Sequence, residues 1–233
     1  MSNYNFDGSA DGDWDEKGDL SWNEFDWQQF LKRQQKEISR FITFYDQHFE
    51  EADRLDKAAN RMGWDVQDWS AAEPEMDDDD DAPTSSLTGD DEADEMDLDP
   101  YTLHRHPVFV ASAGLYAQVR YAWEIVVNRR FKQIDSRITW KFAQSLHDGE
   151  MNMVMALQSL DMGDYMLAVV HLKWVLRALN ESLTLAPATA QYASDPADFL
   201  QQMRIRLFDL REICLRVMQD SREEERRGFR END

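Results

Sequence analysis

An acidic segment that divides the chain in two constrains the fold more than any other feature. Residues 65–99 contain 16 Asp and Glu side chains and no Lys or Arg, with five consecutive Asp at 77–81. Like-charge repulsion and scarce apolar side chains oppose collapse of such a segment into a packed core. We therefore expect residues 63–103 to be a disordered acidic linker, with the folded part of the chain on either side of it.

The net charge of −22 belongs entirely to the first part of the chain. Residues 1–103 carry 30 acidic and 8 basic side chains, whereas residues 104–233 carry 17 of each. Negative charge repels nucleic-acid phosphates, so we expect no nucleic acid among the ligands. The same charge attracts a protein partner that has a basic surface.

A helical repeat of apolar residues precedes the linker. From Trp22 to Met62 these residues recur at spacings of three and four, which predicts one long helix over residues 21–62 that packs on the core and ends at Gly63. Residues 1–20 lack the repeat, and we expect a disordered acidic leader there. The leader also lacks the basic and apolar regions of a secretion signal, which favours a cytoplasmic location.

The helical pattern resumes at Pro107. The run that follows is apolar on nearly all sides, which is typical of a central buried helix. Arg120 and Glu124 lie in its middle, where they oppose insertion into a membrane and can pair on one helix face. We therefore expect a core helix and no contact with a membrane.

Capping residues indicate where three further helices begin. Ser136, Asp164 and Asp195 each precede a stretch with helical apolar spacing, and Pro196 suits a first helical position. These helices complete a four-helix core over residues 104–221, followed by a charged tail over residues 222–233 that frays in solvent. The predicted fold is all-α: a helical bundle of about five helices, with the acidic linker after the first helix.

Residues 13–25, DWDEKGDLSWNEF, carry the sharpest chemical signal. Calcium loops of the EF-hand place oxygen ligands at alternate positions, a glycine at the sixth position and a bidentate glutamate at the twelfth. Counted from Asp13, Asp15 occupies the third position, Asp19 the seventh and Glu24 the twelfth. The stretch therefore resembles an EF-hand loop, which implies calcium bound by these four residues in a regulatory protein.

A plain helix start explains part of the same stretch. Ser21 and Glu24 have the spacing of a capping box, and the apolar residues Leu20 and Phe25 that flank them can form a hydrophobic staple. The two interpretations share Glu24, which is a calcium ligand in one and a capping residue in the other.

Metal chemistry in the bundle is a further alternative. The spacing His-x-x-Glu occurs at His48/Glu51 and at His147/Glu150, and it places each pair on one helix face. Such pairs are metal ligands in helical-bundle metalloenzymes, although the usual order is Glu-x-x-His. Cys214 lies on an apolar stripe and is expected to be an inert core thiol.

One segment resembles a repeat family. Residues 153–179 are similar to a tetratricopeptide-type hairpin, with Gly163, Tyr165 and Ala168 at the turn. The resemblance implies two antiparallel helices joined by a tight turn. The sequence holds no second copy at the family's spacing, so a solenoid is not expected.

The leading hypothesis is a non-enzymatic protein–protein interaction or adaptor protein, without a cofactor. Its acidic arm would engage a basic partner, and apolar side chains within and beside the arm would add affinity. The expected contact residues are Trp64, Trp69, Met76, Asp77, Asp78, Asp79, Asp80 and Asp81. The many Trp and Phe side chains also leave self-association through an uncovered helix face open.

Overall fold

The computed structural model describes residues 22–64, 103–130 and 133–231, and over these residues every regular element is helical. The elements are α1 (Glu24–Gln47), α2 (Arg54–Met62), the short 3-10 helix η4 (Leu103–Arg105), α3 (Pro107–Arg130), α4 (Ser136–Asp161), α5 (Tyr165–Ala190) and α6 (Pro196–Glu231). The all-α prediction is confirmed, with six α-helices in the described part rather than about five. The expected leader and almost all of the expected linker lie outside the described residues.

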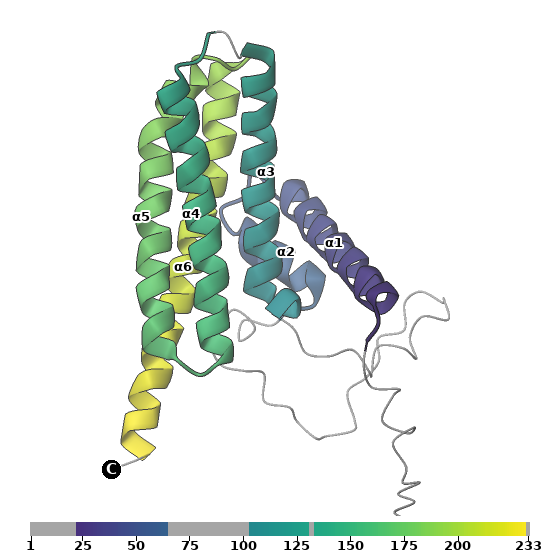
Figure 1. Ribbon diagram of the computed structural model, residues 1–233, viewed down its shortest axis with the longest axis vertical. Coiled ribbons are helices and arrows are strands. Elements are labelled where there is room, and N and C mark those ends of the chain that lie inside the picture. Colours follow the sequence, from purple (N-terminus) through teal and green to yellow (C-terminus); the bar gives the residue numbers. More distant parts are fainter. Residues whose placement is uncertain (1–21, 65–102, 131–132, 232–233) are drawn as a thin grey trace, which may run out of the picture.

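Helices α3 to α6 run up and down as a four-helix bundle (Figure 1). Helix α4 packs along α5, α5 packs along α6, and α3 contacts both α4 and α6. Helices α1 and α2 pack against each other, and α1 lies on the side of α3 away from the α4–α5 hairpin. The central position predicted for α3 is therefore confirmed, since α3 touches α1, α4 and α6.

One hydrophobic core joins the bundle to the N-terminal helix pair. Its largest fully buried side chains come from five helices and include Phe41, Tyr45, Tyr116, Phe142, Leu146, Leu157, Leu172 and Leu207. Arg120, in the middle of α3, forms an ion pair with Glu150 of α4, so its partner lies across the bundle rather than at Glu124 of its own helix. No helix of the described residues has the length and apolar character needed to cross a bilayer.

Turn chemistry sets most helix ends as the sequence predicts. Gly63 and Gly163 have left-handed backbone conformations, with φ of 83° and 73°, and each follows the end of a helix. Asp164 caps α5 by accepting a hydrogen bond from the Leu167 amide at 3.0 Å. Asp195 does the same for α6, with the Ala197 amide at 3.2 Å.

Two helix starts differ from the prediction. Asn23 caps α1, accepting from the Phe25 and Asp26 amides at 2.8 and 3.2 Å, and the Asp26 carboxylate accepts from the Asn23 amide in return. The capping box expected at Ser21 is therefore formed two residues later. Asp135 rather than Ser136 caps α4, because its carboxylate reaches the Arg137 amide at 2.8 Å.

Helix α6 continues through the charged tail to Glu231 and extends beyond the bundle (Figure 1). The residues from 222 to 231 are helical, and whether they fray in solution stays a prediction. Charged side chains in this part interact at helical spacing, as in the ion pair between Arg227 and Glu224 at 2.7 Å. Interactions of this kind stabilise a solvent-exposed helix by a few tenths of a kcal/mol each.

Candidate functional site

The long helix expected over residues 21–62 is two helices, because the chain turns at residues 48–53. Three acidic residues, Glu50, Glu51 and Asp53, occupy this turn. Negative charge is unfavourable at the C-terminus of a helix and favourable at the N-terminus of the next. Apolar spacing alone does not report this preference, and the turn brings Tyr45 and Arg54 to the same place on α6.

That place is Asp209, a carboxylate buried in α6 with 6% of the residue exposed. Arg54 grips it with two hydrogen bonds, from Nε to Oδ2 at 2.6 Å and from Nη2 to Oδ1 at 2.7 Å. The fully buried Tyr45 hydroxyl donates to the same Oδ2. We call these three residues the Asp209 cluster; it joins α1, α2 and α6.

Each ionisable group of the Asp209 cluster has its hydrogen-bond partner within the cluster. Burial raises the pKa of Tyr45 far above its ordinary value, and the neighbouring Asp209 charge raises it further, so the phenol remains a hydrogen-bond donor at physiological pH. The hydrogen bonds to Asp209 raise the pKa of Arg54. A carboxylate matched by a bidentate guanidinium and a phenol holds helices in place and offers no free base for proton transfer.

Two further ion pairs link α6 to α1 and α2 near the cluster. The Arg206 guanidinium lies over the Phe49 ring, 4.7 Å from its centroid, and pairs with Asp46 at 3.1 Å. Arg216 of α6 binds Asp56 of α2. Beside these pairs, a cleft of 320 Å³ opens between α2 and α6 and is lined largely by charged side chains.

Of the predicted calcium ligands, only Glu24 lies among the described residues. It is an exposed residue in the first turn of α1. Asp13, Asp15 and Asp19 lie outside the described residues, so the calcium site stays a prediction.

Three of the four residues in the two His-x-x-Glu pairs, His48, Glu51 and Glu150, form hydrogen bonds or ion pairs. His48 Nδ1 lies 2.7 Å from Glu51 Oε1, and Glu51 also binds Lys57. Glu150 is occupied by Arg120, and His147 is exposed. Over the described residues there is no group of three or more His, Cys, Asp and Glu that could hold a metal ion.

Among the expected partner-binding residues, Trp64 is in the described part and packs within the body. Its ring stacks on Phe41 with centroids 5.6 Å apart. Trp69, Met76 and Asp77 to Asp81 lie outside the described residues. Cys214 is buried, its thiol donates to the Leu172 carbonyl at 3.2 Å, and burial raises its pKa to about 12, as expected of a core thiol.

Sequence reasoning missed the Asp209 cluster, although a signal for it existed. Asp209, Ile213 and Val217 follow one another at spacing four on α6, and all three are buried. A carboxylate in register with an apolar stripe requires a buried cationic partner. The apolar periodicity therefore shows that Asp209 needs a partner. It does not identify that partner, because Arg54 lies 155 residues away in the sequence.

These features define an all-α helical-bundle protein with an N-terminal helix pair attached through buried charge. Comparison with known proteins found no matching family, no matching curated protein and no matching solved structure.

Proposed function

We propose that this chain is a non-enzymatic interaction protein whose acidic segment, residues 65–99, binds a partner with a basic surface. The observation that carries the proposal is the charge of this segment: 16 acidic side chains without a Lys or Arg, in a chain that is neutral from residue 104 onward. Charge of this density attracts a basic surface and accelerates encounter with it.

The way the region joins the body supports this proposal. On the N-terminal side Trp64 stacks on Phe41 of α1, and on the C-terminal side the His104 ring lies edge-on to Phe30 of α1, with centroids 6.3 Å apart. Phe30 and Phe41 are 11 residues apart in the sequence, which places the two attachments roughly 16 Å apart along the helix. A partner bound by the segment would therefore be held beside α1.

Within the segment, Trp69 and Met76 are the apolar side chains that we assign to partner contact, with Asp77 to Asp81 as the electrostatic centre. Interface energy commonly concentrates in a few aromatic and apolar side chains, whereas exposed charges mainly set the encounter rate and the choice of partner. Trp64 is left out of this set because its ring packs on Phe41.

The test compares three full-length chains as baits in host extract, followed by mass spectrometry. The first is the natural chain. The second has all 16 acidic residues of 65–99 changed to Asn or Gln, and the third has residues 65–99 in shuffled order. We expect the natural chain to enrich a basic protein that the neutralised chain loses, and circular dichroism should report equal helicity for all three.

A purified partner then gives the decisive measurement. Its affinity for the natural chain should fall as salt rises, because screening weakens exposed charge pairs. The shuffled chain keeps the charge of the segment but moves Trp69 and Met76. Its affinity for the partner therefore shows whether charge alone is sufficient or whether the positions of these two side chains matter. Equal enrichment of the same proteins by the natural and neutralised baits would exclude the proposal.

A further inference from the structure

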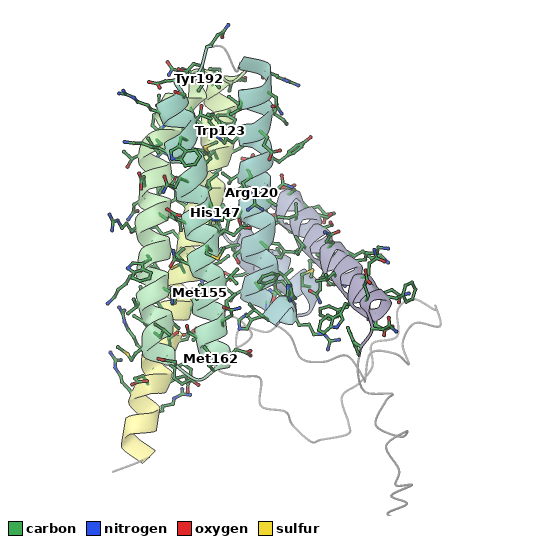
Figure 2. All side chains as sticks on the ribbon, in the orientation of Figure 1. Arg120, Trp123, His147, Met155, Met162 and Tyr192 are labelled. Atoms are coloured by element: carbon green, nitrogen blue, oxygen red, sulfur yellow. The ribbon has the colours of Figure 1, made fainter. Side chains whose placement is uncertain are left out.

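A row of basic side chains lies along the exposed side of α1. Lys32, Lys36 and Arg40 follow one another at a spacing of four residues, so they share one face of the helix, and all three are exposed. Arg33 adjoins the same face. We call these four residues the α1 basic stripe. Figure 2 shows side chains of α1 that project away from the other described helices.

The positive charge of the stripe is poorly matched within the described part of the chain. Arg40 pairs with Glu37 at 3.9 Å, and both side chains are about half exposed. Lys32 and Lys36 form no ion pair with a described residue. Like charges four residues apart repel each other and destabilise a helix. An anionic group bound over the stripe would therefore stabilise α1.

The two attachments of the acidic segment lie at the two ends of the stripe. Trp64 stacks on Phe41 at one end, and the His104 ring lies edge-on to Phe30 at the other. The whole stripe, residues 32–40, lies between these two positions of α1. Residues 65–102 therefore leave α1 at one end of its densest positive charge and return to it at the other.

The length of the stripe matches the run of five Asp at 77–81. The stripe extends for roughly 12 Å from Lys32 to Arg40, at 1.5 Å per residue of helix. Five consecutive residues of an extended chain cover roughly 13 Å, at about 3.3 Å per residue. Asp77 is 13 residues from Trp64 and Asp81 is 22 residues from Leu103. Both connections are therefore long enough to bring the run to any point of the stripe.

We propose that the α1 basic stripe binds the acidic segment of its own chain, with residues 77–81 along Lys32, Lys36 and Arg40. Attachment beside the stripe gives the segment an effective concentration on the order of millimolar, an advantage that a free polyanion lacks. Residues 1–21 are a second acidic stretch, but they carry 6 acidic side chains and a Lys, against 16 acidic side chains and no basic one in residues 65–99.

The contact would regulate partner binding, and this consequence rests on the proposed function. The stripe and a basic partner compete for the same carboxylates. The apparent affinity of the partner is therefore lowered in proportion to the fraction of chains in which the segment is free of the stripe. Exposed ion pairs weaken as salt rises, so the competition should be strongest at low salt.

Line broadening by a nitroxide label tests the contact without any partner. The label is placed at Ser85→Cys in the full chain, four residues beyond Asp81, where it removes no charge. Cys214 is buried and should not react. We expect the amide signals of residues 32–40 to broaden, and the broadening to fall at high salt. A labelled chain mixed with a separate, isotopically enriched chain detects contact between copies, which should be absent.

Charge reversal on α1 supplies the matched comparison. The double variant Lys32→Glu/Lys36→Glu should reduce the broadening of residues 32–40, because the stripe then repels the segment. The control is Lys173→Glu/Arg177→Glu on α5, which reverses two exposed basic side chains at the same spacing and changes the net charge equally. It should leave the broadening unchanged.

An oligolysine peptide serves as the basic probe for the competition. Its affinity should rise by roughly 3- to 10-fold in the α1 variant, as expected when a competitor that occupies most chains is removed, and should rise less in the α5 control. Equal broadening in the natural chain and the α1 variant, or broadening only between copies, would overturn the contact and leave the proposed function standing. Loss of partner capture with the broadening intact would remove the proposed function alone.

Discussion

The N-terminal helix pair and the α4–α5 hairpin share one hydrophobic core, but the contacts that are added to this core differ between the two regions. The pair α1–α2 is fixed on α6 through a buried carboxylate, Asp209, together with Arg54 and Tyr45. In the hairpin, small residues bring helices close together. A Cβ atom placed on Gly149 of α4 would lie 3.5 Å from Ala178 Cβ on α5 and 2.5 Å from the Tyr116 hydroxyl on α3.

The difference predicts which region separates first. A buried ion pair gains little over apolar packing because both charges lose their hydration, but it is lost abruptly when one partner is removed. Close packing of small residues does not depend in this way on one pair of side chains. We therefore expect α1–α2 to open at lower free energy than α4–α5, and the acidic segment to be joined to the less stable region.

The largest effect is expected from Asp209→Ala. The substitution leaves the Arg54 guanidinium and the Tyr45 hydroxyl without their common acceptor, which should destabilise the protein by about 3–5 kcal/mol. Hydrogen exchange should show loss of protection in α1 and α2 while α4 and α5 remain protected. Chemical denaturation measures the total change in the free energy of unfolding.

Asp56→Ala is the matched control for Asp209→Ala, because it also removes a carboxylate that binds an α6 arginine. The Asp56 side chain is 50% exposed, and exposed ion pairs contribute about 1 kcal/mol or less. Equal destabilisation by the two variants, or uniform loss of protection over all helices, would remove the distinction between the two regions.

The next effect is a pH dependence at the start of α3. His106 Nδ1 accepts a hydrogen bond from the Val108 amide at 3.2 Å, which requires a neutral ring nitrogen and caps α3. Burial lowers the pKa of His106 to about 4, although Asp161 acts in the opposite direction. Between pH 6.5 and 4 the unfolded chain therefore binds a proton that the folded chain excludes, and stability falls as the pH is lowered through this range.

We expect this loss to be roughly 1–3 kcal/mol from pH 7 to pH 4. The comparison variant is His106→Asn, since Asn is a favoured capping residue and does not titrate. Its denaturation midpoint should depend less on pH than that of the natural chain over the same range. Parallel curves for the two proteins would assign the acid sensitivity to other groups.

The contrast between the two regions also explains what the sequence could predict. The α4–α5 turn is local: Gly163 and Asp164 adjoin the helices that they end and begin, so spacing and capping residues were sufficient. The same holds for Pro107 and Pro196, each the first residue of its helix. Helix termination by a glycine or a cap depends on neighbours in the sequence, and a single sequence contains them.

The break between α1 and α2 depends on partners far away in the chain. Apolar spacing continues across residues 48–53, but Arg54 and Tyr45 meet Asp209 only if the helix is interrupted. Ion pairing between residues more than 150 positions apart leaves no periodic signal.

On the hairpin side, Gly149→Ala should have a smaller effect. The added methyl group would lie 2.5 Å from the Tyr116 hydroxyl, and relieving such a contact in a packed core typically costs 1–3 kcal/mol, partly offset by the better helix propensity of alanine. Tyr116 Oη is buried and has no hydrogen-bond partner among the described residues. Thermal denaturation should therefore show that Tyr116→Phe alone is neutral or stabilising, and that it rescues Gly149→Ala.

Gly114→Ala is the control for that close approach. Its Cβ would lie 2.9 Å from both Cδ1 and Cγ1 of Ile42, an aliphatic side chain in place of the rigid Tyr116 ring. A loss as large as that of Gly149→Ala would show that the rigid Tyr116 ring is not the cause.

The smallest effect separates the two roles assigned to Glu24. Asn23 and Asp26 form the cap of α1, so Asn23→Ala should cost about 1 kcal/mol, whereas Glu24→Gln should leave stability nearly unchanged. The EF-hand resemblance predicts that calorimetry with calcium gives heat that Glu24→Gln removes and Asn23→Ala retains. Absence of heat at millimolar calcium, or heat that survives Glu24→Gln, would exclude Asp13, Asp15, Asp19 and Glu24 as a calcium site and leave this region with capping alone.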